Sequence, residues 1–384
     1  LPGGDSAGLG LDNKKIAEIR RRAGEHESAA VVILKDGKVA VERYGDGKTD
    51  PVNAMSVSKS VTALAIGKLI NKGKFNLNTR LSRLIKGWPR KGDKGMVTIR
   101  HLLTHTSGLD TRRAGDGDKI LERGLASKMK FRPGTRFWSN NNAVDLLAAV
   151  VKDVTGEHLD AHLEKHIFKP MGITGTSWKR DPEGVPLAAG SLGIRPIDLA
   201  KIGQLMLQKG MWNGKQLVPR KWVSLMLKPG SPVSADHGML WWRKVPLNHR
   251  VTKGALREWA RAKVDPALIK KVRALEGKAY PERDALTKAL EQTLGKEELK
   301  KLRATLQKRG GVPLYHTDDR GPMTSFSGRG WLGQYLVVVP AHNLVAVRMR
   351  QARPQDYRAK QGRDAYGGFR DDILELVATE KETP

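Results

Sequence analysis

Two short strand pairs at opposite ends of the chain constrain its fold more than any other feature. Residues 29–35 and 38–44 are predicted strands on either side of Asp36-Gly37, a dipeptide that favours a tight hairpin. Residues 334–339 and 344–349 form a second predicted pair around Pro340–Asn343. Helices are expected at 13–22 and 371–378. This order predicts an α/β fold in which an antiparallel sheet takes one hairpin from each end of the chain and is covered by the terminal helices.

The middle of the chain is predicted to be helical. Residues 56–71 form an apolar helix that ends at Lys72-Gly73, and residues 143–154 form the clearest amphipathic segment of a helical region from 81 to 179. Two further helices between 198 and 227 flank the turn Trp212-Asn213-Gly214. We therefore divide the chain into a sandwich subdomain (11–75, 196–243 and 312–384), a helical subdomain (76–195) and a basic helical insertion (244–311).

The insertion concentrates the positive charge of the chain. The 384 residues include 69 Lys or Arg against 40 Asp or Glu, a net charge of +29, and residues 243–310 alone carry 19 basic against 8 acidic side chains. Leucines at helical spacing predict amphipathic helices here, namely Leu286, Leu290, Leu294, Leu299, Leu302 and Leu306. Two interpretations stay open: a solvated helical pair that caps a pocket, or a docking surface for an anionic polymer or partner.

Composition excludes several classes of protein. The absence of cysteine excludes disulfide scaffolds, thiol nucleophiles and cysteine-based zinc sites. The longest apolar runs, such as 143–151, fall short of the roughly 18 residues needed to span a bilayer. Hydrophobic residues at 39% and nine tryptophans argue against disorder. We expect no nucleic acid as the main partner.

The first residues bear on location. The chain starts at Leu1 and continues through a stretch with Gly and Ser at 2–10, which suits a processed N-terminus. We expect a periplasmic or secreted protein, with a cytoplasmic location as the alternative.

The strongest chemical signal is Ser56-Val57-Ser58-Lys59 at the start of the apolar helix. A spacing of three residues places the Ser56 hydroxyl and the Lys59 amine on one helical face, roughly 5–6 Å apart at Cβ. Burial and the helix dipole lower the pKa of such a lysine, which then serves as a base for the serine. The N–H of Ser56, free at the helix N-terminus, is a candidate oxyanion donor. An isolated Ser-x-x-Lys is more often an N-capping serine followed by a solvated lysine, so the motif alone is a weak signal.

Four further segments, in order, resemble the landmarks of the serine β-lactamase-like hydrolases, which include class C β-lactamases, DD-peptidases, esterases and amide hydrolases. The resemblance covers about residues 25–243 and 320–380. The segments are His101-Leu102-Leu103-Thr104-His105-Thr106-Ser107-Gly108-Leu109, Pro133-Gly134-Thr135-Arg136-Phe137, Pro170-Met171-Gly172-Ile173 and Gly330-Trp331-Leu332-Gly333-Gln334.

The resemblance implies an antiparallel sheet flanked by helices plus a helical subdomain, with the active site between them. It implies Ser56 as the acyl-accepting nucleophile and Lys59 as its base, with no metal or organic cofactor. The family's Lys-Thr-Gly or His-Thr-Gly element is missing, and Trp331-Leu332-Gly333 looks like the Trp-x-Gly of the esterase branch. The N–H of Trp331 is then the second oxyanion donor, unless this tryptophan only packs in a strand.

The chain departs from the family where a tyrosine is expected. After Pro-Gly-Thr the family has Tyr-x-Asn, and its tyrosine exchanges protons with the lysine. Ungapped alignment puts Ser139 at the tyrosine and Asn141 at the asparagine. Asn141 is then expected to orient the substrate or Lys59. Loss of a positioned proton-transfer group costs typically 10²–10⁴-fold in rate. Three explanations stay open: an engineered Tyr→Ser exchange, a Lys59 that suffices with a bound water, or a natural weak or inactive homologue. Tyr315, after the insertion, is the one tyrosine expected to approach from a loop.

Four other patterns are weaker. Gly4-Asp5-Ser6-Ala7-Gly8 matches a nucleophile elbow but lacks the strand and helix that such an elbow needs. Gly47-Lys48-Thr49 lacks the first glycine of a phosphate loop. His158, His162 and His166 share a helical face, but no carboxylate accompanies them in this pattern, so no metal is expected. His105 is expected to hold its loop rather than to act as a base.

We predict a serine hydrolase that acts on small esters or amides, with activity impaired by Ser139. Residues expected to contact substrate are Trp138, Trp242, Arg329, Gly330 and Gly333. Arg329 keeps open the alternative of a β-lactamase or a D-amino acid peptidase. A second alternative is a non-catalytic homologue that binds an anionic partner through the basic insertion.

Overall fold

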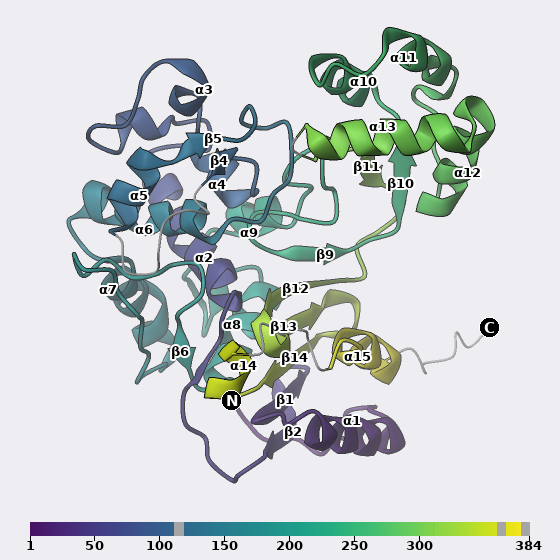
Figure 1. The fold of residues 1–384 in the computed structure, drawn as a ribbon. Coiled ribbons are helices and arrows are strands. Elements are labelled where there is room, and N and C mark those ends of the chain that lie inside the picture. The colour runs from purple at the N-terminus through teal and green to yellow at the C-terminus, as the bar shows by residue number, and fades with distance from the viewer. Residues whose placement is uncertain (111–118, 310, 359–365, 378–384) are drawn as a thin grey trace.

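One antiparallel sheet built from both ends of the chain organises the fold (Figure 1). The computed structural model describes residues 1–110, 119–309, 311–358 and 366–377. The N-terminal and C-terminal hairpins join through one antiparallel pair of strands, residues 30–35 and 344–349, with Val32 opposite Val347. The strands follow in the order β2 (Lys38–Tyr44), β1 (Ala30–Lys35), β14 (Leu344–Met349), β13 (Gln334–Val339), β12 (Ser325–Gly330) and β9 (Trp242–Lys244). The predicted antiparallel α/β sheet is confirmed.

Turn chemistry explains the first hairpin. Asp36 and Gly37 both have positive φ, at 52° and 76°. A two-residue hairpin loop of this kind needs positive φ at both central positions, which Asp and Gly tolerate better than most residues. The turn thereby fixes which residues of β1 and β2 face each other.

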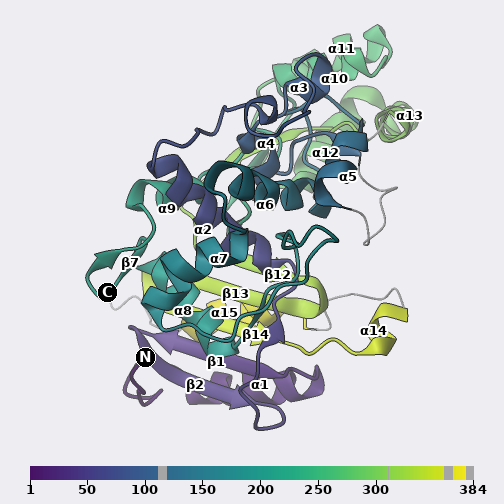
Figure 2. The same cartoon turned by 90° about the vertical axis from the view of Figure 1, so that its left-hand side faces the viewer.

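Helices cover both faces of the sheet (Figures 1 and 2). Alternate residues of β1 point to opposite faces: Val31 and Ile33 pack with α1 (Asn13–Glu25) and α15 (Phe369–Val377). Val32 and Leu34 belong to the larger core, which includes α2 (Val57–Asn71) and α8 (Pro196–Leu207). The helix predicted over 13–22 is three residues too short: Ala23 is buried in the core and the helix continues to Glu25. The predicted end of the last helix at Ala378 lies outside the described residues.

The helical subdomain packs around α2. The apolar residues of this helix were predicted to lie largely on one side, but the helix is buried on all sides over most of its length, with Ser58, Lys59, Ser60 and Thr62 also buried. Helices α6 (Asn141–Thr155) and α7 (Leu159–Leu163) contact it, and Trp222 of α9 (Arg220–Met226) donates to the carbonyl of Ala63. The other helices of this part of the fold are α3 (Gly92–Gly95), α4 (Ile99–Leu103) and α5 (Ile120–Ala126). Short strand pairs brace the loops: β3 (Val52–Asn53) with β6 (Gly193–Ile194), β4 (Leu109–Asp110) with β5 (Lys128–Met129), and β7 (Met211–Trp212) with β8 (Lys215–Gln216). A short helix, α14 (Pro354–Arg358), follows the sheet.

Residues 251–312 contain a hydrophobic core of their own, in the lobe at the upper right of Figure 1. The chain enters and leaves it through the strand pair β10 (Leu247–Arg250) and β11 (His316–Asp319). The six leucines predicted to face inward are all buried, together with Trp259. The helices are α10 (Lys253–Arg261), α11 (Pro266–Val272), α12 (Arg283–Leu294) and α13 (Lys296–Lys308). Among the described residues, no helix is long and apolar enough to cross a membrane.

Candidate active site

Helix α2 places Ser56 and Lys59 side by side. Ser56 is the N-cap of α2, and Lys59 follows within the first turn. The preceding Met55 has a positive φ of 47°, and its N–H donates to the Asn53 side chain at 2.8 Å. Lys59 Nζ donates to Ser56 Oγ at 2.5 Å. The three-residue spacing therefore produces a direct serine–lysine contact.

The surroundings of Lys59 favour its neutral form. Its side chain is buried, and burial lowers the pKa of Lys59 to about 8, although the carboxylate of Asp145 opposes the shift. Lys59 Nζ also donates to the carbonyl of Ala189 at 2.7 Å, while the N–H of Ala189 donates to Asp145 Oδ1 at 2.8 Å. The backbone of Ala189 therefore links Lys59 to α6. About a tenth of the Lys59 amines are neutral at pH 7, enough for a general base.

A cavity of about 240 Å³ opens over this pair. Of the predicted site residues it brings together Ser56, Lys59, Ser139 and Trp331 with the expected substrate contacts Trp242, Arg329 and Gly330. The other lining residues are Ser60, His105, His237 and Leu240. The volume fits a small acyl or aryl group.

Glycines let strand β12 run close to the start of α2. A Cβ on Gly328 would lie 2.9 Å from Val57 Cγ1 and 3.0 Å from Ser60 Oγ. A Cβ on Gly330 would lie 2.8 Å from the carbonyl oxygen of Ala54. Only residues without a side chain allow this approach, which brings the end of β12 to the cavity.

Trp331 follows β12 in a tight turn. Leu332 has a positive φ of 64°, and the carbonyls of Leu332 and Gly333 accept hydrogen bonds from Nη1 of the buried Arg348 at 3.0 and 2.9 Å. The Trp331 ring packs against Tyr357. Arg348 thus fixes the backbone of this turn through two hydrogen bonds, and an oxyanion donor needs such a fixed position. The donor role of Trp331 stays a prediction.

Two imidazoles face the cavity beside Ser139. The rings of His105 and His237 lie 5.3 Å apart, and both line the cavity. Burial lowers the pKa of His237 to about 4 and that of His105 well below its usual range, and the positive charge of Lys59 adds to both shifts. His105 Nδ1 accepts the N–H of Asn140 at 3.3 Å and its carbonyl accepts the N–H of Trp138, so it also holds the loop, as expected. The sequence analysis did not identify His237 as a site residue. The only signal was its position five residues before Trp242, which was predicted to contact substrate.

Three predicted residues do not line the cavity. Asn141 is exposed in the first turn of α6, whereas the neighbouring Asn140 is the N-cap and accepts the N–H of Ala143. Trp138 lies under the ammonium of Lys130, 3.9 Å from the ring centroid. Gly333 belongs to the turn held by Arg348. Residues 139–141 are all polar, so the sequence pattern does not indicate which of them faces the cavity.

Tyr315 does not approach the cavity. Its ring packs against His249, 5.1 Å between centroids, and joins the core of the insertion. Among the described residues that line the cavity there is no tyrosine.

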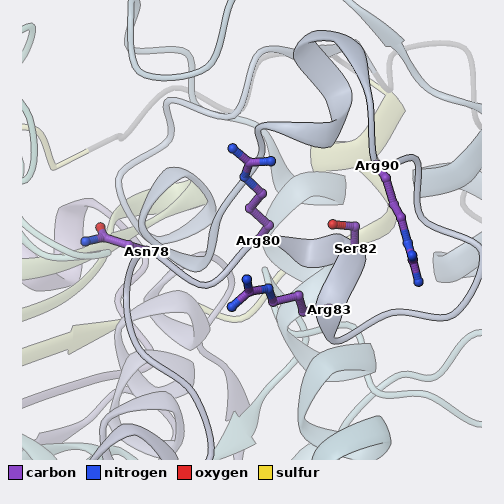
Figure 3. A pocket seen from close by; sticks show the side chains of 5 residues that line it. All are labelled: Asn78, Arg80, Ser82, Arg83 and Arg90. Carbon is purple, nitrogen blue, oxygen red and sulfur yellow. The ribbon is translucent and has the colours of Figure 1, made fainter.

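A second cavity, of about 740 Å³, lies between Asn78, Arg80, Ser82, Arg83 and Arg90. Figure 3 shows that its three guanidinium groups point in different directions rather than toward one point. Among the described residues that line it, no general base lies beside Ser82. The cavity over Ser56 and Lys59 is therefore the candidate active site.

Comparison with solved structures defines the class of fold. The structure titled a putative beta-lactamase from Bacteroides dorei DSM 17855 matches with a TM-score of 0.66 and 16% identity, over 96% of this chain and 99% of that one. The fold is therefore β-lactamase-like. The family model described as Beta-lactamase matches residues 15–366, and the chain belongs to the beta-lactamase family. The predicted resemblance is confirmed.

Two curated relatives carry different names. The putative penicillin-binding protein PbpX of Bacillus subtilis (strain 168) is 26% identical over 260 residues, 59% of this chain and 64% of the relative. Esterase EstB of Burkholderia gladioli is 30% identical over 210 residues, 48% of this chain and 52% of the relative. The chain thus spans less than two thirds of either relative.

Proposed function

We propose that this protein is a serine hydrolase that forms an acyl-enzyme on Ser56 and acts on small esters or simple amides. The observation that carries the proposal is the 2.5 Å contact between Ser56 Oγ and Lys59 Nζ in a small cavity, where burial lowers the pKa of Lys59 to about 8. A serine and a base within hydrogen-bond reach are the signature of nucleophilic catalysis.

The reaction runs through two acyl transfers. Neutral Lys59 takes the proton of Ser56 as Oγ attacks the substrate carbonyl, and the resulting oxyanion accepts hydrogen bonds from the N–H groups of Ser56 and Trp331. The tetrahedral intermediate collapses to an acyl ester on Ser56, and the leaving group departs with the proton held by Lys59. Water then attacks the ester, giving its proton to Lys59, which returns it to Ser56 Oγ as the acid leaves.

Ser139 slows proton transfer in this scheme. Ser139 lines the cavity. Ungapped alignment gives it the position of the family's tyrosine, and its short side chain lacks a phenol's reach and acidity. Lys59, alone or with a water in the freed space, then handles every proton. The buried imidazoles of His105 and His237 are neutral at pH 7 and add no positive charge to the site.

The lining of the cavity favours a small, mostly uncharged acyl group. Leu240 and Trp242 supply apolar walls, and the name of EstB, an esterase, agrees with this. Arg329 supports the alternative. Its guanidinium lies half-buried in the cavity, 5.2 Å from the centre of the Trp242 ring, where it offers a charge to a substrate carboxylate. That contact suits a β-lactam or a D-amino acid peptide, in line with the name of PbpX.

A substrate panel separates these classes. We would measure kcat/KM for neutral p-nitrophenyl esters, a penicillin and a D-alanyl peptide, in the native protein and in Arg329→Gln. The proposal expects ester hydrolysis that Ser56→Ala and Lys59→Ala abolish and that Arg329→Gln leaves within about threefold, because a neutral ester needs no anion contact. Preferred turnover of penicillin or peptide, lost in Arg329→Gln, would establish the alternative instead.

The competing class is a non-catalytic protein that binds a polyanion through the basic insertion. Its support is charge alone, since residues 243–310 carry 19 basic and 8 acidic side chains. Binding of this kind weakens steeply as salt rises, because counterions are released on binding. Ester turnover by Ser56 is the observation that would exclude a purely non-catalytic role.

A further inference from the structure

The end of α6 and the segment after it bring one carboxylate and two imidazoles together. Glu157, His162 and His166 each offer a ligand atom, and these atoms all lie within 4.8 Å of one another. In the part of the chain that the structure describes, no other group of three His, Cys, Asp or Glu residues is this close. The cluster lies outside the cavity over Ser56.

Local backbone geometry builds this cluster. Helix α6 ends at Gly156, whose φ of 75° turns the chain and brings Glu157 over the following helix. His162 lies in α7, and His166 lies in a single π-helical turn, Glu164–Phe168, that directly continues it. Turns of this type are often found at functional sites. His158, expected on the same face, is the N-cap of α7 and is not part of the cluster.

The spacing approaches that of a tetrahedral metal site. His162 Nδ1 lies 3.4 Å from Glu157 Oε2, and two ligands bound to zinc at about 2.0–2.1 Å are about 3.3 Å apart in tetrahedral geometry. The rings of His162 and His166 meet edge to face, with centroids 4.5 Å apart. His162 is 2% exposed, and its Nε2 is buried with no hydrogen-bond partner among the described residues. Its other nitrogen, Nδ1, faces Glu157 and is the ligand atom whose spacing fits zinc.

The surrounding charges restrict which ions fit. Lys165 Nζ contacts Glu157 Oε1 at 2.6 Å, and the ammonium groups of Lys68 and Lys72 also act on both imidazoles. A bound cation would have to displace Lys165 from Glu157 and bind despite the positive charges of Lys68 and Lys72. Ions that rely on oxygen ligands, such as Mg²⁺ and Ca²⁺, gain too little from one carboxylate. Imidazole nitrogen favours Zn²⁺ and similar transition-metal ions.

We propose that Glu157, His162 and His166 form a binding site for Zn²⁺ or a similar divalent transition-metal ion, with water in the fourth position. On binding, Lys165 leaves Glu157 and the ion takes its place. The site joins the end of α6 to α7 and therefore ties two elements of the helical subdomain. It is independent of the reaction proposed at Ser56.

Metal titration tests the proposal directly. The full-length protein would be stripped with a chelator and titrated with Zn²⁺ by calorimetry, and with Co²⁺ by visible absorption. We expect one ion per chain in the native protein and binding at least about tenfold weaker in His166→Gln and in Glu157→Gln, because each removes one of three ligands. His158→Gln is the matched control, since His158 lies nearby but outside the cluster, and it should bind as the native protein does.

Thermal unfolding gives a second readout. Zn²⁺ should raise the melting temperature of the native protein and of His158→Gln, but not of His166→Gln, since a ligand that binds only the folded state stabilises it. His166 and Glu157 are only half-buried, so their variants should fold, and the melting curve without metal verifies this. Equal Zn²⁺ affinity in native protein and His166→Gln, or no binding to native protein, would overturn the proposal.

Discussion

At the scale of single residues, the proposed mechanism depends on the protonation state of Lys59. Its pKa is lowered to about 8 by burial, so the ammonium form dominates below pH 8 and the neutral base above it. For a neutral ester we expect kcat/KM to rise about tenfold per pH unit up to pH 8 and then to level off. Rates measured from pH 6 to 10 test this. A rate that stays flat from pH 6 to 10 would instead point to a base with a lower pKa, such as the buried imidazole of His237 or His105.

Ser139 is the second decisive residue. Replacing it by tyrosine restores the phenol that the family uses, and Ser139→Tyr should raise turnover by roughly 10²-fold or more. Ser139→Phe is the control, because it fills the same space without the hydroxyl. Steady-state kcat for an ester measures both. Equal kcat values in the two variants would show that the larger side chain, and not its hydroxyl, raises turnover.

The contact between Ser56 and Lys59 could be predicted from the sequence because both lie on one turn of one helix. The rest of the site is assembled from distant segments. Ala189 contacts Lys59 across 130 positions of the chain, and Leu240 accepts a hydrogen bond from Ser60 Oγ across 180. No local pattern encodes such contacts. This is why His237 escaped prediction and Asn141 was placed in a site that it does not line.

At the scale of elements, strand β12 and helix α2 determine the width of the site. In Gly328→Ala the new methyl would press on Val57 and Ser60, so β12 must move away from α2. We expect a loss of about 1–3 kcal/mol in the free energy of unfolding and a drop in kcat. Denaturant titration and ester kinetics measure the two effects. Gly321→Ala, whose new Cβ would meet nothing closer than 3.5 Å, is the control, and an equal effect there would contradict the account.

Elements with a strong local signal are predictable to within about two residues at each end. The strands 334–339 and 344–349 match the structure, and α6 extends from Asn141 to Thr155 around the predicted 143–154. Of the three histidines predicted to share a helical face, His162 and His166 do meet, across the π-helical turn at Glu164–Phe168. His158 does not join them, because it precedes α7 as its N-cap.

At the scale of the whole molecule, the insertion touches the loop beside the active site. Arg136, within the Pro133–Phe137 landmark, donates through Nη1 to the carbonyl of Arg309 at 3.0 Å. Glu258 of α10 lies near Arg136, and burial raises its pKa to about 7. The insertion therefore supports the loop from outside the cavity.

This arrangement predicts that the charge of the insertion and the activity are separable. Reversing the exposed Lys300 and Lys301 of α13 to glutamate should leave kcat/KM for a neutral ester within about twofold from low to high salt, because surface charges are screened and the substrate is uncharged. The same kinetics on native protein provide the reference. A steep fall in ester activity with salt, removed by the double variant, would give the insertion a direct part in the reaction.

The acyl-enzyme on Ser56 is the central claim, and intact-protein mass spectrometry after mixing with a p-nitrophenyl ester tests it most directly. The account predicts a mass increase of one acyl group, located at Ser56 by peptide mapping and absent in Ser56→Ala. With Ser139→Tyr the adduct should be short-lived and turnover fast. No adduct and no turnover in either the native protein or Ser139→Tyr would contradict the assignment of this protein as a serine hydrolase.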